Sequence, residues 1–438
     1  MSWELEVVSP VHIGCGSRAG AFEFLTDGEY AYYVPAEKLC EALSAEIGGL
    51  GRAVRALAAA FRQARSDSEV SDILQQIAPG HAPGVVDRLK RPGGYGYRVL
   101  RVHGRFSEVM VHIKQEPDLP YVPGSSIKGA IRTAVLYSLY QANESFYQKH
   151  VAERLGSFWE TNRDLYKDAA RNDRRAKGRL SASFLWQFSP LRAFEAAALH
   201  AGGRGDVHSD VLRHLLVADT EPAHADDALA LACAEVVGTD RRGEPMRLWA
   251  EVLRPGTKLA WAGVQAEGEM RHASAASWQA LVEQQGYNLQ QTRLASSWVL
   301  VRKCIQRFSS AVLVAEAEYW NQRYKPDEMS DRCWRRFEEL RRPAAQRVEN
   351  LKKRNSEDTP LLRVGGHEGL LSTTIALLVE QRDPDLYRRA VAPATRGRAY
   401  PAFFPKTRRV VRMPGAQEPD LAGWVRIRPG TDSSVPQG

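Results

Sequence analysis

A strand, a glycine-rich turn and the start of a helix follow one another in each half of the chain, and this repeated order constrains the fold most strongly. In the first half, FSEVMVHIK (residues 106–114) alternates as a strand does, and PGSS (residues 123–126) then precedes an apolar helix pattern. In the second half, LLRV (residues 361–364) is followed by GGHEG and then by STT at a helix start. This order predicts an α+β fold, compatible with ferredoxin-like βαββαβ units.

Shifts in composition along the chain predict four segments. Residues 1–140 form a first α+β unit, and residues 141–240 form a mainly helical insertion with one strand near residues 213–219. Residues 241–429 form a second α+β unit, in which MRLWAEVL and TKLAW predict two strands joined by a Pro-Gly turn. Residues 430–438 are polar and are expected to be disordered. Long helices of the second unit are expected at the following ranges: 274–285, 297–324 and 332–354.

Composition excludes several classes of protein but does not identify a ligand or a reaction. The chain has 60 Lys and Arg against 52 Asp and Glu, and its net charge of +8 suits a polyanion, although many ordinary enzymes reach the same value. The five cysteines form no CxxC pair and the histidines lack ligand spacing, so neither a disulfide framework nor a metal site is predicted. The sequence has no signal peptide and no apolar run of the roughly 20 residues that span a membrane. We therefore expect a cytoplasmic protein without a cofactor.

The stretch YVPGSSIKGAIRT (residues 121–133) has the features of a phosphate-binding helix start. Ser125 or Ser126 can cap the helix, whose first N–H groups and positive dipole end attract an anion. Lys128 and Arg132 are four residues apart and therefore lie on one face, where each can neutralise a phosphate. The lysine is followed by glycine rather than by Ser or Thr, so an ATP-binding loop is not predicted. A capped helix with solvated basic residues is the alternative interpretation.

Three further segments suit a polyanion. PVHIGCGSRAG (residues 10–20) predicts a glycine-rich turn, and RVGGHEGLLSTT (residues 363–374) predicts a second glycine loop before a helix. FFPKTRRVVR (residues 403–412) interleaves aromatic and basic residues, a pattern that suits single-stranded RNA through stacking and phosphate pairing. Tight turns and a solvated basic strand explain the same patterns without a ligand. The candidate RNA-binding residues of these segments are His12, Gly14, Gly16, Gly365, Gly366, His367, Lys406, Arg408 and Arg409.

The sequence predicts no catalytic constellation. It contains no G-x-S-x-G, no H-E-x-x-H and no Cys–His signature. Asp219 in VADTEP is interpreted as the cap of a turn at the end of a strand, with a general base or a metal ligand as the alternative. The motifs therefore favour a binding protein over an enzyme.

Considered together, the motifs resemble those of one protein family. VSPVHIGCG, LPYVPGSSIKGAIRTAVL, EVLRPGT and the final series RVGGHEGLLSTT, FPKTRRVV and GWVRI are similar to motifs of the RAMP superfamily of CRISPR-associated proteins. The similarity is greatest to the subunits that cap the backbone of type III-A (Csm) effector complexes, and it is weak across residues 141–235. It implies two RRM-like or ferredoxin-like units with glycine-rich loops and a largely helical insertion.

The resemblance also implies a function. A protein of this kind is expected to be a non-catalytic RNA-binding subunit that caps the backbone filament near the 3′ end of the crRNA and supports crRNA maturation in antiviral defence. Expected partners are the crRNA, the target RNA, the neighbouring backbone RAMP subunit, the small subunit and host nucleases that trim the crRNA 3′ end, with no membrane. Lys128 and Arg132 would then bind guide-RNA phosphates, or would hold the packing between subunits or domains.

Two alternatives to this function remain open. The first is a RAMP endoribonuclease that processes the CRISPR RNA precursor, with His12 as the general base and Lys128 stabilising the developing charge. The second is the equivalent capping subunit of a type III-B complex.

Overall fold

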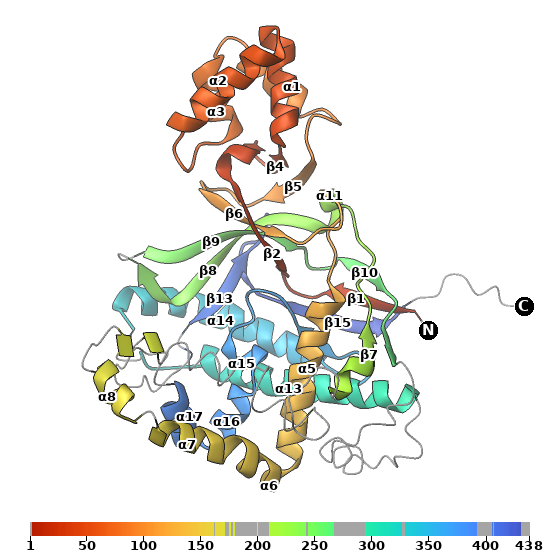
Figure 1. Cartoon of the computed structure of the whole chain (residues 1–438), viewed down its shortest axis with the longest axis vertical. Coiled ribbons are helices and arrows are strands. Elements are labelled where there is room, and N and C mark those ends of the chain that lie inside the picture. Colours follow the sequence, from red (N-terminus) through yellow and green to blue (C-terminus); the bar gives the residue numbers. More distant parts are fainter. Residues whose placement is uncertain are drawn as a thin grey trace, which may run out of the picture.

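The computed structural model combines β-sheets with many helices and so confirms the α+β class predicted from the sequence (Figure 1). It describes the following residues, with a few short pieces between them: 2–161, 163–170, 210–241, 244–266, 294–325, 329–391 and 407–430. The helix expected at 274–285 lies outside these ranges, as does nearly all of the expected tail. The division of the chain into units at residues 140 and 240 remains a prediction.

A four-stranded antiparallel sheet joins segments from opposite ends of the sequence. Its inner strands are β1 and β15, and Leu5 lies opposite both Leu259 and Ile427. Leu5 and Val7 alternate along β1, so they lie on one face, and both are fully buried. The strands, in order across the sheet, are β10 (Lys258–Trp261), β1 (Trp3–Val7), β15 (Trp424–Pro429) and β12 (Leu361–Arg363).

A nine-stranded sheet is built around the long strand β8, which pairs with β9, β5 and β13. The first residues of β8, LALA, are fully buried, as expected for a central strand covered on both faces. The strands of this sheet are β2 (Gly14–Gly20), β6 (Glu108–His112), β9 (Glu244–Leu253), β8 (Leu229–Arg241), β5 (Tyr97–Arg101), β4 (Tyr30–Tyr33), β3 (Phe24–Thr26), β13 (Arg408–Arg412) and β14 (Asp420–Leu421). Strands β7 (Leu215–Val217) and β11 (Val264–Ala266) form a separate pair, and β7 agrees with the strand expected near residues 213–219.

The turn predicted for residues 10–20 is wrong over its second part. Gly14–Gly20 forms β2, an edge strand of the nine-stranded sheet. It pairs with β6, and the register of this pairing shifts between Gly14 and Arg18. Most side chains of β2 are exposed. An exposed edge strand needs no alternating apolar side chains, so its small residues resemble a turn in the sequence.

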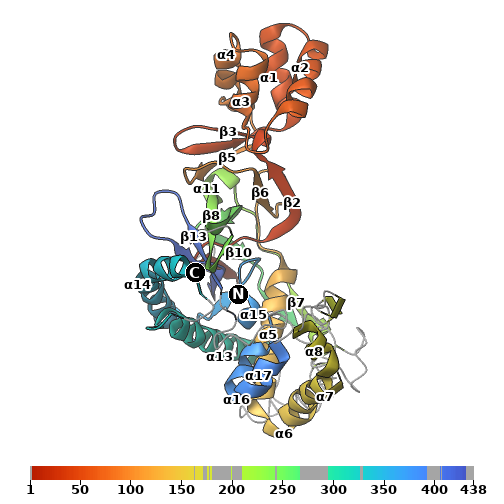
Figure 2. The ribbon, with the colours of Figure 1, turned by 90° about the vertical axis from the view of Figure 1, so that its left-hand side faces the viewer.

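Four helices between β4 and β5 project from the rest of the molecule (Figures 1 and 2). The amphipathic pattern of α2 places Ala53, Leu57 and Ala60 on its buried face. These residues pack in a hydrophobic cluster that the four helices share with strands β3 and β4, separate from the main core. The helices are α1 (Ala36–Ile47), α2 (Leu50–Gln63), α3 (Val70–Ile77) and α4 (Ala82–Leu89).

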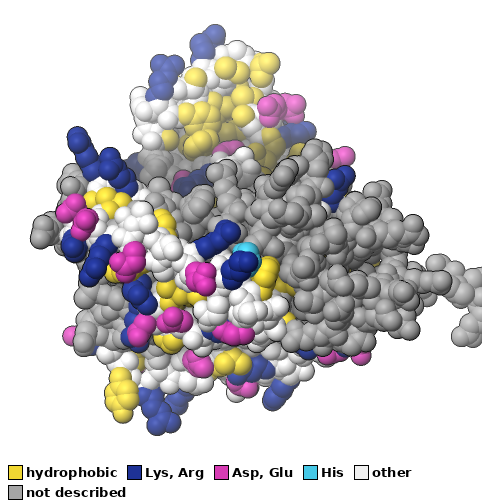
Figure 3. Space-filling model, turned by 60° about the horizontal axis from the view of Figure 1, so that its bottom comes forward, with side chains coloured by type: hydrophobic (Ala, Val, Ile, Leu, Met, Phe, Trp, Pro, Cys, Tyr) yellow, Lys and Arg dark blue, Asp and Glu magenta, His cyan; other side chains and the backbone are white. Residues whose placement is uncertain are grey.

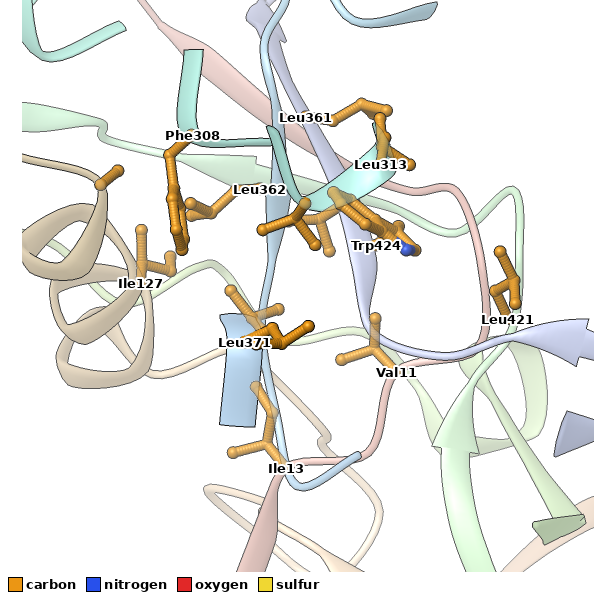
Figure 4. Close-up of a cluster of buried hydrophobic side chains, with 14 of the residues drawn as sticks. Val11, Ile13, Ile127, Phe308, Leu313, Leu361, Leu362, Leu371, Leu421 and Trp424 are labelled. Carbon is orange, nitrogen blue, oxygen red and sulfur yellow. The ribbon is translucent and has the colours of Figure 1, made fainter. Parts of the chain in front are cut away.

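The long helices lie on the other side of the nine-stranded sheet from this projection (Figure 1). Helix α13 packs against α5, α14 and β12, and Figure 4 shows Phe308 and Leu313 of α13 among the side chains of the main core. Ser330 caps α14, since its hydroxyl accepts from the Cys333 N–H (3.2 Å). The main helices of this layer are α5 (Gly124–Ala142), α13 (Leu294–Trp320), α14 (Asp331–Arg354), α16 (Ala376–Arg382) and α17 (Pro384–Val391).

Shorter helices complete the described structure. They are the 3-10 helices η1 (Ala21–Glu23) and η5 (Val211–His214), the π-helix η2 (Gln148–Ala152), and the α-helices α6 (Glu144–Tyr147), α7 (Glu153–Thr161), α8 (Arg163–Ala170), α11 (Ala225–Ala228) and α15 (Leu370–Thr373). No helix in the described part of the chain has both the length and the apolar character that crossing a membrane requires.

Candidate nucleic-acid interface

Helix α5 begins at Gly124, where the sequence predicted a phosphate-binding helix start. The Gly124 N–H donates to Oδ1 of Asp219 (2.7 Å), so a carboxylate of the protein already lies at the positive end of this helix. A Cβ atom on Gly124 would lie 2.2 Å from the carbonyl oxygen of Val217, so this close approach requires glycine. Asp219 is therefore a helix cap supplied from another segment, whereas the sequence predicted that it caps the turn after its own strand.

The two basic residues of α5 have different surroundings. Arg132 Nη1 lies 2.7 Å from Asp210 Oδ2, and both side chains are mostly buried. Lys128 is half-buried and forms no ion pair with any other described residue. Burial lowers the pKa of Lys128, Asp210 opposes this shift, and Arg132 adds to it. Ser125 is exposed and Ser126 is half-buried in the first turn, so Ser125 and Lys128 are the residues of this stretch best placed to meet a ligand.

The two glycine segments predicted from the sequence meet in the structure. The Gly366 N–H donates to the His12 carbonyl oxygen (2.8 Å), and a Cβ atom on Gly365 would lie 2.3 Å from that oxygen. The imidazole rings of His12 and His367 stack with their centroids 5.5 Å apart. Gly14 lies beside them, since a Cβ atom there would be 3.1 Å from His12 Nε2. Five predicted residues from opposite ends of the sequence thus form one cluster.

Glu251 on β9 holds this region together from within the sheet. Its fully buried carboxylate accepts hydrogen bonds from the His112 N–H (2.9 Å), from Lys114 Nζ (2.5 Å) and from the Tyr97 hydroxyl. Its backbone carbonyl accepts from His12 Nδ1 (2.8 Å). Sequence reasoning missed Glu251, because its partners come from three separate segments and no spacing in the sequence relates them.

His112 is the third histidine of this group, which we call the histidine cluster: His12, His112 and His367. His112 Nδ1 accepts from the Ile13 N–H (3.2 Å) and its Nε2 lies 3.2 Å from the Tyr121 carbonyl oxygen, so its hydrogen bonds fit a neutral ring with the proton on Nε2. Burial lowers the pKa of His112 to about 3, and nearby His12 adds to the shift. Because Tyr121 lies just before α5, His112 also links the cluster to the start of that helix.

We expect His112 to make the fold sensitive to acid. Its pKa of about 3 in the folded state lies below the usual 6.5, so the stability it contributes above pH 6.5 is lost as the pH falls toward 3. Between pH 6.5 and 5 this loss is about 2 kcal/mol. His112→Gln keeps a donor and an acceptor but does not titrate, so its free energy of unfolding, measured with urea, should fall less over this range. Equal falls in the two proteins would contradict the assignment.

Arg408 of the basic C-terminal segment is buried and paired. Its Nε lies 3.0 Å from the carboxylate of Glu316, and its guanidinium lies 4.1 Å from the ring centroid of Tyr319. The other side of Glu316 contacts Arg363 (3.1 Å). Burial raises the pKa of Glu316, but Arg408 and Arg363 outweigh this effect and hold the pKa below its usual value. This ion-pair network favours a structural role for Arg408.

Arg409 connects the basic strand to the histidine cluster. Its Nη1 donates to the Gly366 carbonyl (2.7 Å) and to His367 Nδ1 (3.3 Å). The Nε2 atom of His367 is buried without a hydrogen-bond partner among the described residues, and burial lowers the pKa of His367 to about 3. A cavity of about 250 Å³ lies beside His367, Glu368 and Arg409. Lys406 lies outside the described residues.

Most of the predicted residues form two groups, which His112 links through its contact with Tyr121, and Gly16 lies apart from both. Ser125 and Lys128 lie on α5, and the glycine loops with His12, His367 and Arg409 form the other group. Gly16 lies further along β2, is exposed and has a positive φ of 86°.

The surface supplies no uniform basic face in the view of Figure 3, where basic and acidic side chains are interspersed over the lower part of the molecule. Among the described residues, no group of three or more His, Cys, Asp and Glu side chains is arranged to hold a metal ion.

Comparison with protein families and curated proteins relates the chain to CRISPR-associated proteins. Residues 4–210 match the model of the RAMP superfamily. CRISPR system Cms protein Csm5 of Methanocaldococcus jannaschii is 24% identical over 177 residues, which cover 40% of this chain and 39% of that protein. The aligned region therefore spans well under half of this curated relative.

Two solved structures share the fold over nearly the whole chain. A chain of the cryo-EM structure of a Csm–crRNA–target RNA ternary complex of a type III-A CRISPR-Cas system matches with a TM-score of 0.63 and 20% identity, over 98% of this chain and 100% of that one. The crystal structure of T. onnurineus Csm5 matches with a TM-score of 0.59 and 20% identity, over 96% and 99%. These likenesses and the family match confirm the RAMP-type α+β fold expected from the motifs.

Proposed function

We propose that this chain, whose residues 4–210 match the model of the RAMP superfamily and whose fold is like that of Csm5, is a non-catalytic RNA-binding subunit of a type III-A CRISPR effector complex. The observation that carries the proposal is the likeness, over nearly the whole chain, to a protein of a Csm–crRNA–target RNA complex. The proposed partners are the crRNA, the target RNA and other Csm subunits. In this role the chain caps the backbone filament near the 3′ end of the crRNA and supports crRNA maturation.

Exposure divides the proposed RNA-binding residues into contacting and supporting groups. The contacting residues have side chains or backbone at the surface: Gly14, Gly16, Ser125, Ser126, Lys128, Gly365, Gly366 and Arg409. The supporting residues are buried or paired inside the protein and fix the loops: His12, Arg132, His367 and Arg408. The exposed glycines of β2 and of the loop at Gly365 and Gly366 let an RNA backbone approach closely, and Lys128 supplies a positive charge.

The surroundings of His12 support a binding role over ribonuclease activity. The ring is buried, burial lowers its pKa, and Nδ1 bonds to a backbone carbonyl. No hydrogen bond joins His12 to Lys128 or to a hydroxyl group among the described residues. Purified protein incubated with labelled repeat RNA without metal should therefore leave the RNA intact, whereas site-specific cleavage that His12→Ala abolishes would establish the nuclease instead.

Co-purification tests the proposed place in a complex. The tagged chain, expressed with its genomic neighbours, should return several subunits together with short RNAs of fixed 5′ end and variable 3′ end. A monomer that returns without RNA would overturn the proposal.

Lys128 provides a test at the level of a single contact. If it neutralises one phosphate, Lys128→Ala should lower the slope of log K against log salt by about 0.7 and should weaken binding evenly across RNA sequences. The measurement is fluorescence anisotropy of labelled single-stranded RNA at several salt concentrations. Lys149→Ala, which removes an exposed lysine beyond the far end of α5, is the matched control. An unchanged slope in Lys128→Ala would assign Lys128 a structural role.

A further inference from the structure

An arginine-lined groove lies between the first turns of α14 and the face of strands β8, β9 and β13. Its main cavity has a volume of about 530 Å³. A second cavity of about 130 Å³ adjoins it and shares Glu235, Arg247 and Arg412 with it. We define the arginine groove by Arg247, Arg332, Arg335, Arg336 and Arg412, which all line the main cavity. Of these residues, only Arg412 lies in a segment that the sequence analysis selected, FFPKTRRVVR, and α14 was predicted only as a long helix.

The charges of the groove are unbalanced. Its two carboxylates are Glu235 and Glu339, and Arg336 engages both of them, with two contacts to Glu235 (2.6 and 2.9 Å) and one to Glu339 (2.6 Å). The other four arginines form no ion pair with any described residue and are exposed to solvent. Five arginines facing two glutamates give the cavity an excess of positive charge, which an anion in the groove would relieve.

The arginines come from two opposite walls. Arg332 and Arg335 belong to α14, whereas Arg247 is on β9 and Arg412 is on β13. The strand residues flank β8 from both sides, since Arg247 lies opposite Glu235 and Arg412 lies opposite Cys233. An occupant would therefore be held from both sides. Guanidinium groups form paired hydrogen bonds with phosphate oxygens, so a phosphate chain matches this geometry.

An aromatic residue lies where the groove continues. Half-buried Trp249 lines the second cavity together with His103 and Arg105. Arg247, Trp249 and Glu251 alternate along β9, so they lie on one face of the strand, and this face leads from the groove to the histidine cluster. Basic and aromatic side chains combined along one path are typical of sites for single-stranded RNA.

From these observations we infer that the arginine groove binds the phosphate backbone of a single RNA strand. The inference rests on the proposed function, and it adds a second contact surface, built by α14 and the sheet, to the glycine loops and Lys128. An acidic segment of another protein is the competing occupant. The aromatic residue within the path favours RNA, because an acidic peptide needs only the charges.

The test uses the full-length chain and the complex that contains it. The variant Arg332→Ala/Arg335→Ala removes two exposed arginines, three residues apart, from α14. The matched control Arg52→Ala/Arg55→Ala removes an exposed pair with the same spacing from α2, far from the groove. Arg412→Ala tests the opposite wall. Thermal melting of each variant shows whether the fold is intact.

The readout is binding of labelled single-stranded oligouridine at several salt concentrations. If each arginine of the α14 pair neutralises one phosphate, their loss should lower the salt slope by about 1.4 and weaken binding about tenfold near physiological salt. Arg412→Ala should lower the slope by about 0.7, and the α2 control should change neither value.

Other results would show whether the arginine groove alone or the proposed function as well is wrong. Wild-type binding to RNA with unchanged slopes in both groove variants would overturn the groove and leave the proposed function standing. Loss of a protein subunit from the purified complex, with RNA retained and the slope unchanged, would also overturn it and assign the groove to a protein partner. A wild-type complex that contains no RNA would remove the proposed function and the groove together.

Discussion

Replacing Glu316 with alanine should lower the free energy of unfolding by about 3–5 kcal/mol, because it leaves two buried guanidinium groups without their counter-charge. The side chain of Glu316 is 5% exposed, and the side chains of its partners Arg363 and Arg408 are 6% and 9% exposed. The carboxylate on α13 binds one arginine from each main sheet, since Arg363 ends β12 and Arg408 begins β13. Its loss therefore loosens the junction between the two sheets as well as leaving charge buried.

Urea denaturation of Glu316→Ala and of a control measures this effect. Glu349→Ala removes a half-exposed carboxylate whose ion pair with Lys352 (2.8 Å) lies on the surface of α14. Exposed pairs of this kind contribute only about 0–1 kcal/mol. A Glu316→Ala variant as stable as the Glu349→Ala control would show that water or rearranged side chains compensate the two arginines.

Gly365→Ala should destabilise the protein by about 2–4 kcal/mol, whereas Gly366→Ala should change its stability by less than about 0.5 kcal/mol. Gly365 has a φ of +103°, and a Cβ atom there would lie 2.3 Å from the backbone oxygen of His12. Gly366 does not have a positive φ, is exposed, and would place a Cβ atom 3.5 Å from the nearest atom, the Cδ2 of His12. The same added methyl group is thus costly at one position and nearly neutral at the next.

Thermal melting of the two glycine variants provides the comparison. Gly365 lets the second glycine loop pack against the backbone of His12, so the Gly365→Ala variant should also lose RNA affinity. Gly366→Ala should keep the fold, and it therefore tests the loop surface alone. Equal melting temperatures in the two variants would mean that the loop moves away from His12 at little cost.

Elements with a strong local pattern were predictable from the sequence. The helix expected at 332–354 is α14 (Asp331–Arg354), because apolar residues recur at helical spacing and Ser330 supplies a cap. The two strands expected around the Pro-Gly turn are β9 and β10. However, they belong to different sheets, since β9 pairs with β8 and β6 while β10 pairs with β1. A local pattern identifies a strand, but its partner depends on distant segments.

In the candidate site, too, local features were predictable from the sequence and long-range contacts were not. The glycine loops near His12 and Gly365 were identified from composition, and the structure brings them into contact. Asp219 at the start of α5 and Glu251 beneath the histidines were not predictable in these roles, because each acts on segments many residues away. Arg408 lies in the basic segment FFPKTRRVVR, yet its charge is paired inside the protein with Glu316. Sequence pattern indicates which residues carry charge and not whether that charge faces solvent.

The position of β1 between β10 and β15 has a consequence for biosynthesis. While the ribosome makes the chain, β1 can pair with β10 once residue 261 has emerged, but its other edge has no native partner until β15 (Trp424–Pro429) follows. At typical rates of synthesis this interval lasts roughly 10–30 s. An unpaired strand edge is a template for pairing with other chains. The yield of native protein in an expressing cell is therefore governed by how well that edge is protected during translation, by chaperones or by early assembly with a partner.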